Sequence, residues 1–175
     1  MAVKEPPSGN GFVDGHTIEQ DTVLLPRLQD LTDEQIDLSR AMAELADAKT
    51  VPLPEGELTR FADQESRLAR ESWTFLDENP TLAPLIANPL RELTEYQSSS
   101  ADELRHLAEN WIIARKADLD AHSIRRKVQE RAGMLRSLTL QVSFASLDHV
   151  VEHILAEGKM TRPELEDLFD LSKPA

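Results

Sequence analysis

The chain has 175 residues, a formal net charge of −13 and no cysteine. This length suits one domain with a substantial core, and the lack of cysteine excludes disulfides, thiol catalysis and cysteine-ligated metal sites. Leucine and alanine, both strong helix formers, supply 25 and 18 residues. We therefore expect an all-α protein, a single helical domain of about five to seven helices over residues 21–175, preceded by a flexible arm over residues 1–20.

The charge is segregated along the chain. Residues 1–98 carry a net charge of −11, residues 99–145 of +2 and residues 146–175 of −4. An acidic protein repels nucleic acid on average, but the net positive charge of residues 99–145 acts in the opposite direction. The sequence shows neither a long apolar span nor a secretion signal, so we expect a cytoplasmic protein without a membrane segment.

Hydrophobic periodicity predicts two helices in the first half of the chain. The first covers residues 32–48 and opens with a capping box formed by Thr32 and Gln35. The second covers residues 55–78 and ends before Pro80.

The middle of the chain is harder to divide. Residues 81–97 hold two prolines, which predict short helical turns, and the serines at 98–100 predict a linker and a new helix cap. Residues 101–145 form a long central helix or helix pair, since two apolar stripes in different phases indicate a break at 118–123. Within this segment, residues 138–144 alternate between apolar and polar, so a strand that pairs with a copy in a homodimer stays open beside a helix.

The C-terminal part predicts a helical hairpin over residues 146–172. Ser146 caps its first helix and Gly158 closes it, while Thr161 and Glu164 form the capping box of its second helix. In the first helix we expect one apolar arc to face the core, formed by Leu147, Val150, Val151, Ile154 and Leu155.

The first of these helices also contains His149, Glu152 and His153 in the order His-x-x-Glu-His. The pattern resembles that of inverted zinc peptidases, in which it implies two metal ligands and a catalytic glutamate. That family takes its third ligand far downstream, whereas only 22 residues follow His153. Both histidines lie opposite the apolar arc, so we interpret them as a polar helix face, with no metal or cofactor, and keep a metal-dependent enzyme as an alternative.

A basic run is the second candidate site. Its candidate binding residues are Arg115, Lys116, Arg125, Arg126, Lys127 and Arg131, with Arg136 beyond them. Such a helix can follow a phosphate backbone, bind an acidic protein or pair with the acidic helices of its own chain. Aromatic residues for base stacking are absent between these bases, which favours the pairing within the chain.

A third pattern is "TFLDEN", residues 74–79. It is similar to the Ser/Thr-x-x-x-Glu-Gly/Asn signature of antitoxins that block Fic-type adenylylating toxins. The resemblance implies that Glu78 obstructs a nucleotide site, with Thr74 and Asn79 as the other signature positions. Asn79 before Pro80 also ends a helix, so this structural interpretation stays beside the functional one.

No catalytic constellation assembles from the remaining residues. The sequence therefore favours a non-enzymatic acidic protein that binds a protein partner, of the antitoxin, immunity protein, adaptor or chaperone type. Acidic residues such as Asp33, Glu34 and Asp37 would complement a basic partner. A nucleic-acid-associated regulator that uses the basic run is the alternative.

Overall fold

The computed structural model describes residues 18–48, 56–116 and 122–164, except for the side chains of residues 18–23 and 113–116. Its four long helices are α1 (Ile18–Asp47), α2 (Glu57–Glu78), α3 (Pro84–Lys116) and α4 (His122–Ala156). A short helical turn follows at residues 162–164. The predicted single all-α domain is confirmed. Of the predicted arm, residues 1–17 lie outside the described residues, and residues 18–20 belong to α1.

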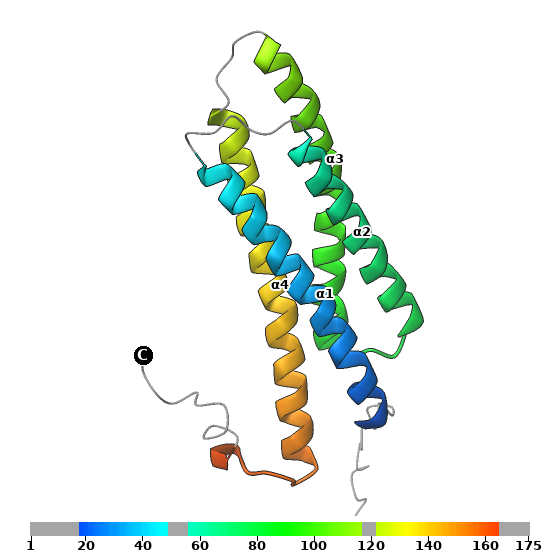
Figure 1. Cartoon of the computed structure of the whole chain (residues 1–175). Helices are drawn as coiled ribbons and strands as arrows, with labels where there is room; N and C mark the ends of the chain where they lie inside the picture. Colours follow the sequence, from blue (N-terminus) through cyan, green and yellow to red (C-terminus); the bar gives the residue numbers. More distant parts are fainter. Residues whose placement is uncertain (1–17, 49–55, 117–121, 165–175) are drawn as a thin grey trace, which may run out of the picture.

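The four helices form an antiparallel bundle in which the chain direction alternates from each helix to the next (Figure 1). Helix α3 packs against α2 and α4, and α1 packs far more extensively on α4 than on α2. The bundle encloses one core, whose largest fully buried side chains include Phe61, Phe75, Met42, Leu90 and Leu135. Each such side chain contributes roughly 1.5–3 kcal/mol through burial.

Helix α1 begins well before the predicted span of 32–48. It passes through Pro26, which is exposed and has no N–H to donate to the preceding turn. The predicted cap at Thr32 is wrong, because its hydroxyl donates to the carbonyl of Gln29 at 2.9 Å inside the helix. Leu28 is buried one turn earlier, so core packing holds this segment helical despite the proline. The prediction for α2 is confirmed to within two residues at its start.

Helix α3 is continuous where short turns and a linker were predicted, so both of those predictions are wrong. Pro89 lies near its start, where a proline removes only one hydrogen bond. Ser98 and Ser99 donate to carbonyls of the preceding turn, to Thr94 at 3.0 Å and to Tyr96 at 2.9 Å. Serines that donate in this way fit inside a helix instead of capping one.

Helix α4 settles the ambiguous segment 138–144 as helix. The predicted break is confirmed in position, since α3 ends at Lys116 and α4 begins at His122. Helix α4 then continues to Ala156, so the predicted helix start at Ser146 is wrong. The hydroxyl of Ser146 donates to the carbonyl of Val142 at 2.8 Å.

The end of α4 follows the prediction. Gly158 has a φ of 64°, and the N–H of Lys159 donates to the carbonyl of Ile154 at 3.4 Å, as in a Schellman motif. The N–H of Thr161 donates to the Glu164 carboxylate at 2.7 Å, which confirms that capping box. The rest of the predicted hairpin, residues 165–172, lies outside the described residues.

Candidate functional site

The second half of α4 carries an apolar face that the bundle does not bury. The buried positions of α4 end at Ala145. Beyond Ala145, the prediction that the apolar arc faces the core is wrong. Leu147 is exposed, and the other four residues of the arc are only half-buried, namely Val150, Val151, Ile154 and Leu155. The physical reason is the side of the helix on which these residues lie. The buried residues of α4, such as Leu138 and Val142, face the core from one side, and the arc lies on a different side of the same helix.

Four apolar residues in the second half of α4 form a single line that we call the α4 stripe. They are Leu140, Phe144, Leu147 and Val151, spaced by three or four residues, which places them on one side of a helix. The exposed fractions of the first three are 36%, 61% and 37%. Phe144 is thus mostly in contact with solvent although it is the largest apolar side chain of the stripe.

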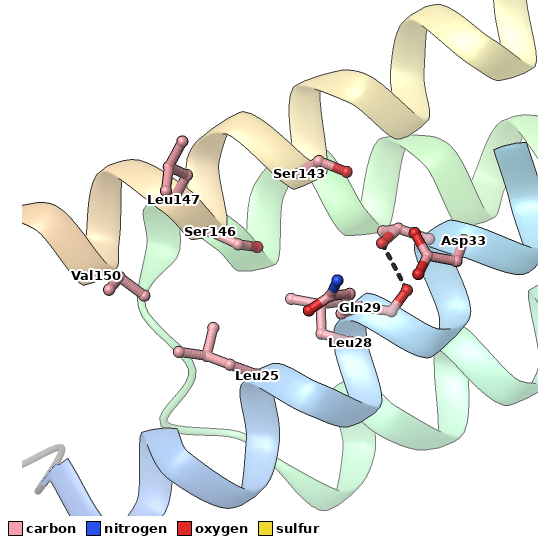
Figure 2. Close-up of a pocket in the computed structure, with 9 residues that line it drawn as sticks. Leu25, Leu28, Gln29, Asp33, Ser143, Ser146, Leu147 and Val150 are labelled. Atoms are coloured by element: carbon pink, nitrogen blue, oxygen red, sulfur yellow. Dashed lines mark hydrogen bonds between the residues drawn. The ribbon is translucent and has the colours of Figure 1, made fainter. Parts of the chain in front are cut away.

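Beside the stripe lies a cavity of about 360 Å³ between α1 and α4, which we call the α1–α4 groove. Its apolar walls are Leu25 and Leu28 from α1 and Leu147 and Val150 from α4 (Figure 2). The groove lies toward the end where α1 and α4 diverge in Figure 1. It exists because α4 runs on past its last buried residue while α1 leans away.

The hydroxyl groups that line the groove have hydrogen-bond partners within their own helices. Ser143 donates to the carbonyl of Thr139 at 3.2 Å, and Ser146 and Thr32 donate to carbonyls of their own helices. These hydroxyls need no ligand to satisfy their donors, so the groove presents mainly apolar surface.

Acidic residues lie at the groove and near the stripe. Asp33 of α1 lines the groove, Asp30 is exposed one helical turn before it, and Asp148 is exposed on α4 one turn after Phe144. No basic side chain of the described residues pairs with these three acids. Of the other acids predicted to bind a partner, Glu34 pairs with Arg67 at 2.5 Å and Asp37 pairs with Arg40 at 2.9 Å. Asp33 is therefore the predicted acid that the structure brings to the groove.

The structure divides the basic run instead of placing it on one face. One guanidinium nitrogen of Arg125 donates to the carbonyls of Leu45 and Ala48 at 3.0 and 2.8 Å, at the C-terminal end of α1. Arg131 is only 15% exposed and pairs with Glu103.

The other members of the run contribute less to a common surface. Arg126 and Lys127 are exposed, and Arg126 lies 3.6 Å from Glu130. The side chains of Arg115 and Lys116 lie outside the described residues. Among the described members, solvent-facing charge is therefore left mainly at Arg126, Lys127 and Arg136.

The two histidines of the His-x-x-Glu-His pattern are half-buried on α4, with their rings stacked at a centroid distance of 6.3 Å. His153 lies 3.4 Å from Glu157, while Glu152 lies 3.6 Å from Arg162. In the part of the chain that the structure describes, no three or more His, Cys, Asp or Glu side chains are grouped as a metal site would require.

The "TFLDEN" residues have structural partners at the end of α2. Thr74 donates to a backbone carbonyl one turn earlier at 2.9 Å, and Asn79 donates to the carbonyl of Phe75 at 2.7 Å. Glu78 pairs with Arg27 of α1 at 2.6 Å. Asn79 thus ends the helix, as its structural interpretation predicted.

Sequence reasoning missed a buried polar cluster in the middle of the bundle. Glu65 of α2 is an acidic residue with no exposed surface. Burial raises the pKa of its carboxyl from 4.5 to about 7, and the neighbouring Ser100 hydroxyl and Arg131 guanidinium offset this only in part. Neither carboxyl oxygen accepts a hydrogen bond of regular geometry. Burial also raises the pKa of the adjacent Tyr96.

A second buried polar group lies on three helices. Gln35 of α1 donates to Ser72 of α2 at 3.4 Å and to Gln97 of α3 at 3.5 Å. All three side chains have no exposed surface. Signals for both groups are present in the sequence, since Glu65 and Ser72 continue the apolar stripe of α2 at helical spacing.

Comparisons of the chain with known protein families, curated proteins and solved structures gave no match. Within the described ranges, every helix is too short or too polar to serve as a membrane span.

Proposed function

We propose that this chain is a non-enzymatic protein that binds a protein partner through the α1–α4 groove and the α4 stripe. One observation carries the proposal: the second half of α4 exposes apolar residues in a line beside an apolar groove. Contiguous exposed apolar surface of this kind marks interaction sites in soluble proteins.

The composition of the surface supports the same proposal. Interfaces combine an apolar centre that contains aromatic residues with a polar margin. Phe144 and Leu147 supply such a centre, and Asp33 in the groove, with the exposed Asp30 and Asp148 one turn away on α1 and α4, supplies an acidic margin. The acidic margin would speed association with a basic partner and discriminate against acidic ones.

The proposal is tested by affinity capture from the native source at low salt. The bait is the full chain with a tag, compared with the double variant Phe144→Ala, Leu147→Ala. Met134→Ala serves as the matched control, because Met134 is 50% exposed on α4 but lies outside the stripe. Mass spectrometry and the ratio of absorbance at 260 and 280 nm identify what is captured.

We expect the wild type and the Met134→Ala control to capture one protein in stoichiometric amount, and the double variant to lose it. Equal capture by all three baits would refute the proposed surface. An eluate whose absorbance ratio is that of nucleic acid, and which loses its material after nuclease treatment, would favour the alternative that rests on Arg126 and Lys127.

A further inference from the structure

We propose that the occupant of the α1–α4 groove is a basic amphipathic helix of the partner protein. Its apolar face lies along the α4 stripe, and one large apolar side chain enters the groove between Leu25 and Val150. This inference rests on the proposed function and adds the conformation and charge of the bound segment.

The spacing of the α4 stripe favours a helix as the occupant. The stripe runs from Leu140 to Val151, which corresponds to about 16 Å along a helix. A partner helix of three turns matches this length, and anchors spaced by three or four residues match the stripe itself. The described elements are all helices, so they offer no sheet edge to which an extended peptide could add a strand.

The groove favours an apolar anchor over a polar one. Leu25, Leu28, Leu147 and Val150 form its walls, and its hydroxyl groups already donate to carbonyls of their own helices. Apart from Gln29 and Asp33, the lining offers a polar anchor no group that is not already bonded, so such an anchor would lose its water for little gain. A leucine or phenylalanine gains the burial without that cost.

The acidic residues near the groove indicate which charge the bound helix carries. Asp33 lines the groove on α1, with Asp30 exposed one turn before it, and Asp148 is exposed on α4 one turn after Phe144 of the stripe. Arg136 is an exposed base on α4 one turn before Leu140, and it lines a separate depression together with Arg40, Glu44 and Asp47. Lysine or arginine on the polar face of the bound helix would therefore meet opposite charge along the groove.

The test uses synthetic peptides of about 18 residues, or five helical turns, against the full chain. The first peptide is an amphipathic helix of leucine and lysine. The second has the same composition in scrambled order, and the third keeps the leucine positions but replaces every lysine by glutamate. Calorimetry gives the affinity and stoichiometry at low and high salt.

Two double variants of the chain test the two parts of the surface. Phe144→Ala with Leu147→Ala removes apolar contacts, and Asp30→Asn with Asp33→Asn removes charge from the margin. Asp63→Asn with Asp77→Asn is the charge-matched control, because both residues are exposed on α2 and α2 lies across the bundle from α4.

We expect the lysine peptide to bind one to one, and the scrambled and glutamate peptides to bind at least about tenfold more weakly. The apolar double variant should weaken binding by about tenfold or more, since a few central residues dominate such interfaces. The Asp30, Asp33 variant should weaken it by several-fold at low salt and by less at high salt. The α2 control should bind like the wild type.

Several results would overturn the inference. Equal binding of the glutamate peptide would refute the basic charge, and unchanged binding by the apolar variant would refute the groove. A wild-type dimer in sedimentation that Phe144→Ala dissociates would assign the stripe to a second copy of the chain. Peptide affinity that rises at least about tenfold in Leu168→Asp would assign the groove to the chain's own C-terminal residues.

The two experiments separate the inference from the proposed function. If affinity capture succeeds through the stripe while the peptides show no preference for lysine, the protein-binding function stands and the basic helix is wrong. If the capture itself is independent of the stripe, both are wrong.

Discussion

Replacement of Glu65 by glutamine should make the protein more stable than wild type at neutral and higher pH. Glu65 is fully buried in the bundle and its pKa is raised from 4.5 to about 7. A carboxyl whose pKa is raised by folding contributes its full stability below its unfolded pKa, and that contribution is lost as the pH rises through its folded pKa. The loss for Glu65 therefore falls between about pH 4.5 and pH 7.

The size of the effect follows from the size of the pKa change. One pKa unit corresponds to about 1.4 kcal/mol, so a rise from 4.5 to about 7 corresponds to roughly 3 kcal/mol. Glutamine has a similar shape and does not ionise. Relative to wild type, Glu65→Gln should thus gain up to roughly 3 kcal/mol in the free energy of unfolding between pH 4 and pH 8.

The groups around Glu65 do not produce this dependence themselves. Arg131 of α4 faces the carboxyl and also pairs with Glu103. The pKa of Tyr96 of α3 is raised above its ordinary value of 10, so its hydroxyl stays neutral.

Urea denaturation at several pH values from 4 to 8 measures the effect for wild type and variant. Glu95→Gln, an exposed replacement on α3, is the control and should show no such trend. A stability difference between wild type and Glu65→Gln that stays flat within about 1 kcal/mol over this range would refute the reasoning.

Three further predictions follow from other contacts. Arg125→Ala removes the donor to the carbonyls at the end of α1, so urea denaturation should show a loss of about 1–3 kcal/mol; Arg126→Ala, an exposed neighbour, should change stability by less than about 0.5 kcal/mol. Gly158→Ala places a side chain at a φ of 64°, so we expect thermal unfolding to show a loss of about 1–2 kcal/mol if the end of α4 unfolds with the bundle; a stabilised variant would contradict the left-handed conformation. Arg126→Ala with Lys127→Ala should leave affinity capture of a protein partner unchanged, whereas loss of captured nucleic acid would support the alternative function.

Helix content was predictable from the sequence because apolar residues recur with a helical period. The span of α2 was predicted almost fully, since it carries a regular stripe and ends at Asn79 before a proline. The boundaries inside α1, α3 and α4 were not predictable from local signals. Proline and serine are read as breaks, yet Pro26, Pro89 and Ser146 all lie inside helices that tertiary packing stabilises.

The candidate site was less predictable than the fold. An apolar arc on the second half of α4 was apparent, but a sequence pattern does not tell whether such an arc meets the core or solvent. That distinction depends on where α1 begins and how it crosses α4. The basic run likewise reads as one surface in the sequence, whereas the folded chain turns Arg125 and Arg131 inward to partners on other helices.

The extensive packing of α1 on α4 has a consequence for the protein during its synthesis. Helix α1 packs mainly against α4, and in the sequence these two helices are separated by the whole of α2 and α3. At about 5–20 residues per second, a ribosome needs roughly 5–20 s to make the residues between the end of α1 and the buried part of α4. Throughout this interval the apolar side of α1 lacks most of its cover, so α1 is the segment of the nascent chain that we expect a chaperone to hold.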